Sequence, residues 1–154
     1  MFWRLLFRLC RAGTLAAVVA ALSASAQPSG QPTVEDLKAR LSSTSIGDRP
    51  HLCVQIAQRQ LEEVDKDYTA AEIEKAQAPL VEMVAFSELA RDYAIQSHKY
   101  QKQTEIAVRG MTRKLTDILH SLAHDDQPPV QDALNRLQRV RDDLLASMFQ
   151  KGAK

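Results

Sequence analysis

Cysteine is scarce in this sequence, which contains only Cys10 and Cys53 and no CxxC or CxxCH motif. A thioredoxin-like redox site and a c-type haem attachment site therefore lose their main sequence support. Cys10 precedes the first apolar run, whereas a lipid-attachment cysteine would follow such a run. Cys53 leaves two possibilities, namely a buried thiol or a disulfide that joins two copies of the chain as a homodimer.

Glycine is also scarce, with five residues in the whole chain, and familiar catalytic motifs are missing. The sequence has no GxSxG elbow, no Gly-rich phosphate loop, no HExxH motif and no EF-hand loop. Functional residues tend to lie on loops, and so few glycines leave little loop from which to build a site. We therefore predict that the protein is not an enzyme and uses no cofactor.

Long apolar runs are absent too, and this decides how the N-terminus is interpreted. The segment MFWRLLFRLCRAG contains three arginines and no acid, and it is followed by the short apolar run TLAAVVAAL and by SASA. A bilayer span needs about 20 apolar residues, which this run does not supply. A basic start, a short apolar run and a small-x-small site are typical of a secretory signal peptide. We predict that residues 1–26 are removed between Ala26 and Gln27, leaving a periplasmic or secreted chain without a transmembrane segment.

The predicted mature chain has no strong charge of either sign. Removing residues 1–26 takes away three arginines and no acid, which leaves 17 basic and 19 acidic residues and a formal charge of −2. A nucleic-acid-binding domain would present a basic face. Nucleic acid is therefore not an expected partner.

The pattern that is present is helical. After a flexible lead-in at 27–32, apolar residues recur at helical spacing and alternating strand patterns are absent. Because each long helix has an apolar stripe and the connections are short, we predict an all-α antiparallel bundle of about five helices, four of them long. It forms a single domain over 33–150, with a tail at 151–154. The predicted helices span about 33–41, 50–67, 70–99, 104–124 and 128–149.

Three residues within these helices raise specific expectations. Pro79 lies inside the third helix, whose wide apolar face places it at the centre, and it either kinks that helix or separates two. Cys53 shares an arc of the second helix with Ala57 and Leu61, which favours the buried thiol. Arg141 lies in the apolar face of the fifth helix. Its head group either reaches the edge of the bundle or forms an internal ion pair, for example with an acid of the third helix.

A family resemblance covers about 58–97. The stretch QRQLEEVDKDYTAAEIEKAQAPLVEMV resembles one tetratricopeptide-type helix hairpin, with Ala76 and Leu80 as the small and large packing residues of its second helix. The stretch is a single copy, and Val64 stands where that family has Gly or Ala. The resemblance implies that the protein binds another protein or a peptide.

The segment ILHSLAHDDQPP at 118–129 permits two interpretations. Asp117, His120 and His124 have the i, i+3, i+7 spacing that can place three ligands on one metal ion from the polar face of a helix. Alternatively, the two histidines favour the negative end of the helix dipole, and Asp126 or Gln127 precedes Pro128 at the start of the next helix, where Asp is a favoured cap. We predict the turn between two helices, with no metal ligand, and keep the metal site as the alternative.

These observations lead to one functional hypothesis and its rivals. We expect an exported, non-enzymatic helical protein that acts as a protein- or peptide-binding or structural module in the cell envelope, with an unidentified protein or peptide as its partner. The alternative is a metal-binding or metal-sensing envelope protein that uses Asp117, His120 and His124. A homodimer joined through Cys53 is a third possibility.

Overall fold

The structure, a computed structural model, describes Gly30 and residues 32–150. The predicted signal peptide, most of the lead-in and the tail at 151–154 lie outside the described residues. Within them the chain is helical and has no strand, which confirms the all-α prediction. The elements are α1 (Val34–Ser43), α2 (Arg49–Thr69), α3 (Ile73–Ser97), α4 (Gln101–Ser121), a 3-10 turn (His124–Asp126) and α5 (Gln127–Gln150).

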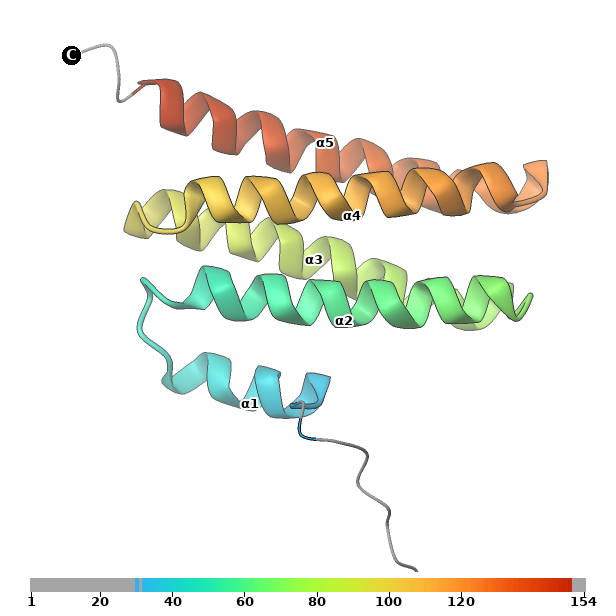
Figure 1. Ribbon diagram of the computed structural model, residues 1–154, viewed down its shortest axis with the longest axis horizontal. Helices are drawn as coiled ribbons and strands as arrows, with labels where there is room; N and C mark the ends of the chain where they lie inside the picture. The colour runs from blue at the N-terminus through green and yellow to red at the C-terminus, as the bar shows by residue number, and fades with distance from the viewer. Residues whose placement is uncertain (1–29, 31, 151–154) are drawn as a thin grey trace, which may run out of the picture. The chain divides into compact units, whose positions relative to one another are not determined.

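The four long helices run up and down in chain order (Figure 1). Each of α2, α3 and α4 is antiparallel to the helix that follows it, so α2 and α4 point the same way. Helix α3 packs against α2, α4 and α5, as the width of its apolar face predicts. The arrangement is the predicted helical bundle.

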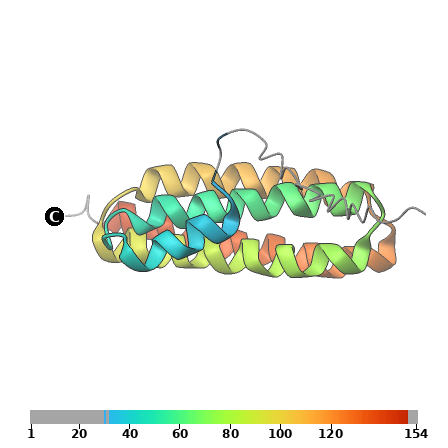
Figure 2. The ribbon, with the colours of Figure 1, turned by 90° about the horizontal axis from the view of Figure 1, so that it is seen from below.

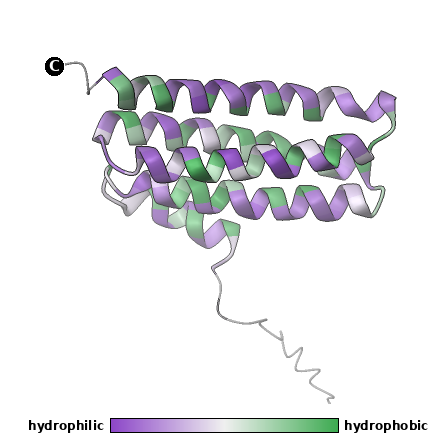
Figure 3. Ribbon diagram, turned by 45° about the horizontal axis from the view of Figure 1, so that its top comes forward, coloured by the Kyte–Doolittle hydropathy of each residue, from purple (hydrophilic) through white to green (hydrophobic). Residues whose placement is uncertain are grey.

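One hydrophobic core joins the four long helices. The apolar stripes predicted for the second, fourth and fifth helices supply most of this core, including the fully buried Val64, Leu115 and Leu137. Figure 3 shows hydrophobic and hydrophilic residues interleaved along every helix, as amphipathic helices require. The sequence pattern missed Met83 and Ser87 of α3, both fully buried. The Ser87 hydroxyl is satisfied because it donates to the carbonyl of Met83 at 2.8 Å.

Helix α1 is short and lies against α2 and α3 (Figure 2). It begins with a capping box, in which Thr33 Oγ1 accepts from the amide of Asp36 and the Asp36 carboxylate accepts from the amide of Thr33. The only fully buried side chain of its described residues is Leu37, which forms a small second cluster with Leu52 and Ile56 of α2.

Helix α3 is continuous through Pro79, which therefore does not separate two helices. Its predicted limits of 70 and 99 are both too wide. Ala71 has a left-handed backbone (φ 58°) and His98 does too (φ 59°), so the helical hydrogen-bond ladder starts and stops inside those limits. Neither position is a glycine, the residue that usually marks a left-handed backbone, so the sequence did not indicate where α3 begins and ends.

The predicted start of the fourth helix at Thr104 is wrong. Helix α4 begins at Gln101, after Tyr100 in a left-handed conformation (φ 60°). Thr104 is buried in the first turns, and its amide donates to the carbonyl of Tyr100 at 2.8 Å. It is an interior helical residue and not a cap.

Arg141 forms an ion pair with a buried acid, which was one of the two expectations, and its side chain is still 21% exposed. Its Nε and Nη2 atoms both lie 3.2 Å from Oε1 of Glu105, a residue only 6% exposed. Arg109 contacts the other oxygen of this carboxylate at 3.3 Å. The acid belongs to α4, so the expectation that it comes from the third helix is wrong.

Candidate functional site: a groove between α2 and α4

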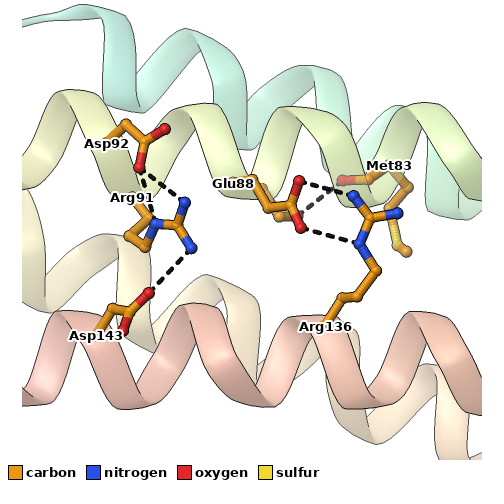
Figure 4. Close-up of polar contacts among 7 residues, drawn as sticks. Met83, Glu88, Arg91, Asp92, Arg136 and Asp143 are labelled. Carbon is orange, nitrogen blue, oxygen red and sulfur yellow. Dashed lines mark hydrogen bonds and ion pairs between the residues drawn. The ribbon is translucent and has the colours of Figure 1, made fainter.

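The seam between α3 and α5 is closed by charged side chains (Figure 4). Arg136 of α5 donates two hydrogen bonds to the carboxylate of Glu88 on α3, at 2.9 and 2.8 Å. One turn further along, Arg91 of α3 donates to Asp143 of α5 at 3.0 Å. These bidentate and paired contacts join the two helices, and a hollow of about 110 Å³ lies beside Arg136 on this seam.

The seam between the parallel helices α2 and α4 is open by comparison. A groove of about 580 Å³ runs along it, which is within the size range of clefts that bind ligands or peptides. Its floor is made by the buried Leu61 and Met111, and its α4 wall by Ile106, Ala107 and Gly110. The polar residues Gln58, Glu62, Asp65 and Lys114 form its rim.

Gly110 is the most informative residue of the groove. A glycine inside an exposed helix lowers its stability by about 1 kcal/mol relative to alanine. A Cβ atom added at Gly110 would meet nothing within 4 Å, so packing within the described chain does not require glycine here. Beside it, Ile106 is 48% exposed although it is a large apolar residue. At Gly110 and Ile106, the α4 side of the groove is therefore apolar, and no other part of the described chain covers it.

Two carboxylates give the α2 wall its charge. Asp65 pairs with Lys114 across the groove at 2.9 Å, and this pair crosses from one wall to the other. Glu62 pairs with Arg59 on its own helix at 2.9 Å, but its side chain is 65% exposed. Surface pairs of this kind contribute little stability, so the Glu62 carboxylate is able to exchange Arg59 for another cation.

Asp117, His120 and His124, the residues of the alternative metal site, do not line this groove. They also do not lie on one helix. Asp117 and His120 are exposed on α4, but the backbone of Leu122 is extended and ends the helix. His124 lies in the 3-10 turn, so the expectation that it continues the polar face of the fourth helix is wrong. Among the described residues, no group of three or more His, Cys, Asp or Glu side chains is arranged to hold a metal ion.

The segment 118–129 therefore forms a connection between helices, as the turn prediction states. The side chain of Gln127 donates to the carbonyl of Leu122 at 3.1 Å and joins the two ends of this connection. Helix α5 starts at Gln127, one residue before the two prolines. Proline is tolerated there because amides of the first helical turn need no partner within the helix.

Cys53 is a free thiol that is fully buried in α2. Burial disfavours the thiolate and raises the pKa of Cys53 to about 11, although the charge of Arg49 acts in the opposite direction. A thiol in this environment is a poor nucleophile at neutral pH. The predicted burial of Cys53 is confirmed, and the disulfide between two copies stays an alternative that a single chain does not test.

Comparisons with known proteins found no family model, no curated protein and no solved structure that matches this chain. Within the part of the chain that the structure describes, no helix combines the length and apolar character needed to cross a membrane.

The sequence interpretation missed the groove, although it contained two signals. Gly110 falls on the face of the fourth helix opposite its apolar stripe, and Ile106 also lies outside that stripe. Neither signal identifies a site until the neighbour of α4 across the seam is known to be α2.

Proposed function

We propose that this protein is an exported, non-enzymatic module that binds an amphipathic helix of another protein in the cell envelope. The bound helix lies in the groove between α2 and α4. The observation that carries the proposal is an apolar, uncovered groove whose α4 wall contains a glycine that the packing of the described chain does not require.

The shape of the groove supports a helix as the ligand. Ala107 and Gly110 lie one turn apart on α4 and have little or no side chain, so another helix can approach the α4 backbone closely. Leu61 and Ile106 also line the groove and provide apolar contacts for the side chains of the bound helix. Binding an amphipathic helix by its apolar face is a common recognition mode for such grooves.

The charge of the rim indicates what flanks the apolar face of the partner. Asp65 already has Lys114 as a partner, whereas Glu62 is largely exposed. We therefore expect a basic residue of the partner helix to pair with Glu62. Charge complementarity of this kind fixes orientation and raises the association rate more than the affinity.

The predicted signal peptide at 1–26 indicates the cellular compartment in which binding occurs, because it would deliver the mature chain to the periplasm or the exterior. The resemblance of 58–97 to a tetratricopeptide-type hairpin agrees with a binding role. N-terminal sequencing of the mature protein from a cell fraction outside the cytoplasm should begin at Gln27. An intact Met1 in a cytoplasmic fraction would contradict the export part of the proposal.

The binding part is tested by site-specific photo-cross-linking of the full chain in cells. A benzophenone amino acid replaces Ile106 in the groove or, as a control, Val81, which is 61% exposed on α3. We expect a discrete protein adduct from position 106 and none from position 81. Gly110→Arg should abolish the adduct, because the long side chain fills the groove, while the isolated variant stays folded and does not unfold at a lower temperature than the wild-type protein.

Two results would contradict this proposal. One is the same set of adducts from both positions, which would indicate contact with neighbouring proteins at random. The other is an adduct at position 106 that persists in the Gly110→Arg variant, since the groove would then not be the binding surface. Glu62→Lys supplies a graded control, with a weaker adduct expected and no change in fold.

A further inference from the structure

Helix α1 is packed outside the main core of the bundle. The core cluster takes its described members from α2, α3, α4 and α5, whereas Leu37 of α1 belongs to the separate cluster with Leu52 and Ile56. A hollow of about 410 Å³ lies beside α1 and is lined by Leu37 and by Gln55 and Gln58 of α2. Helix α1 thus adds one buried side chain, Leu37, and covers Leu52 and Ile56 of α2.

The surface beneath α1 has a definite chemistry. We call it the α1 face and define it by Leu52, Ile56 and Gln60 of α2 and by Glu82 and Phe86 of α3. Its middle is apolar, and its edge presents the carboxylate of Glu82, to which Gln60 also donates a hydrogen bond. It therefore accepts a helix with an apolar stripe and a basic residue beside that stripe.

Helix α1 meets both requirements. Val34, Leu37 and Leu41 follow the i, i+3, i+7 spacing of one helical stripe and contact the apolar part of the face. Lys38 lies with its ammonium group 2.8 and 3.0 Å from the two oxygens of Glu82. The same ammonium group is 5.8 Å from the centroid of the Phe86 ring, a cation–π contact.

The connection between α1 and α2 is a compact turn at 44–48. Ser45 Oγ donates to the Asp48 carboxylate at 2.7 Å, and the amides of Asp48 and Arg49 both donate to the carbonyl of Ser45. If this turn opened into an extended segment, α1 would reach the α1 face of another copy and form every contact that it forms in its own chain. Exchange of an identical element in this way conserves all the contacts and yields a symmetric dimer.

We propose that the α1 face is a self-association surface, and that its second occupant is α1 of another copy of this chain. In the single chain the short connection keeps α1 at a high local concentration, so exchange depends on protein concentration and requires α1 to detach. The residues that define the α1 face do not line the α2–α4 groove, although the hollow beside α1 shares Gln58 and Glu62 with the rim of that groove. The variants that test the two proposals are at different residues, so either proposal can fail by itself.

The experiment is a charge exchange across the ion pair in two full-length mature chains. Lys38→Glu places two carboxylates together within one chain, and Glu82→Lys places two ammonium groups together within the other. When α1 helices are exchanged between the two variants, both faces regain an opposite-charge pair. We expect the equimolar mixture to contain at least tenfold more dimer than either variant alone, as measured by light scattering after size exclusion.

The controls distinguish exchange of α1 from non-specific association of the variants. Adding Leu37→Asp to both variants should return the mixture to monomer, because the apolar contact of α1 with the face is lost. Exchanging charge at a pair elsewhere, Arg136→Glu with Glu88→Arg, should produce no dimer. A mixture of the Lys38 and Glu82 variants that remains monomeric, with both chains folded by circular dichroism, would overturn the proposal.

Discussion

The core shared by α2 to α5 and the small cluster beneath α1 contain leucines that are buried equally well. Leu137 is 0% exposed in the core and Leu37 is 1% exposed beneath α1. Leu137 is surrounded by residues of a cluster that joins four helices, whereas the described partners of Leu37 are few and lie mostly on one helix. Equal burial therefore does not mean equal structural importance, since the number of elements that a side chain joins also matters.

The charged residues differ between the two regions in the same way. Glu105 is buried within the bundle and holds Arg141 and Arg109, whereas Glu82 is about half exposed and holds Lys38 of α1. Removing one partner of a buried pair leaves an unpaired charge away from water, but a surface pair loses only a weak, screened attraction. Variants at these leucines and carboxylates test this contrast between the two regions.

The largest effect is expected for Leu137→Ala, which should lower the free energy of unfolding by about 3 kcal/mol. Because the core joins four helices, native-state hydrogen exchange should show the loss of protection in all of α2 to α5. Leu37→Ala should lower protection in α1 alone, because the core of the bundle has no described member there. Equal loss of protection in α4 and α5 for both variants would contradict the separation of the two regions.

A somewhat smaller effect is expected for Glu105→Ala, about 2 kcal/mol in urea unfolding. The head groups of Arg141 and Arg109 reach water, so the cost is below the 3–5 kcal/mol typical of breaking a fully buried pair. Glu82→Ala at the α1 face should cost less than about 1 kcal/mol. If Glu82→Ala proved as costly as Glu105→Ala, α1 would be more firmly joined to the bundle than its packing indicates.

The third prediction concerns Cys53, next to Leu52 of the α1 cluster in sequence. Its pKa is raised from 9.0 to about 11 in the folded chain, so the unfolded chain loses this proton first as pH rises. Stability is therefore undiminished below pH 9 and falls by about 2 kcal/mol between pH 9 and 11. Cys53→Ala should remove this part of the pH dependence when the unfolding curves of the two proteins are compared.

The same thiol can report which region opens. Ellman's reagent should modify Cys53 at a rate set by unfolding of the bundle, since the thiol is fully buried. Leu37→Ala should leave that rate unchanged, and Leu137→Ala should increase it. Faster modification in the Leu37→Ala variant would mean that α1 covers Cys53 as well as Leu52.

The smallest effect is expected for Gly110→Ala, which should raise the stability of the bundle by about 1 kcal/mol. The added methyl group meets nothing in the described chain and restores normal helix propensity. Thermal unfolding of the isolated protein measures the gain. Destabilisation would show that the groove is not open at this position, and would weaken the binding proposal.

Much of the fold could be predicted from the sequence because the apolar stripes have a clear helical period. The stripe of the fifth helix, from Val130 to Leu144, is buried in the structure as its spacing requires. Helix ends were harder to predict. His98 and Tyr100 adopt left-handed backbones without being glycine, so no residue type marked the connection between α3 and α4.

The candidate site could not be predicted in the same way. Its walls belong to α2 and α4, which are not consecutive in the chain, and a helical period reveals a face without revealing what lies opposite it. The partner of Arg141 was missed for the same reason, because several acids on other helices satisfy the same sequence requirement. The glycine at position 110 was visible as a weak point of its helix, but its meaning depends on the open space around it.

The up-and-down order of α2 to α5 also affects the order in which the parts of the bundle are expected to fold. The strongest packing joins α2 to α3 and α4 to α5, which are hairpins of consecutive helices. Chains dominated by such local contacts fold in microseconds to milliseconds. We expect the α2–α3 and α4–α5 hairpins each to form early, and their docking along the seams that join them to be the slowest step of folding. The groove between α2 and α4 lies on one of those late seams, so the surface proposed to bind a partner is among the last parts of the molecule to be assembled.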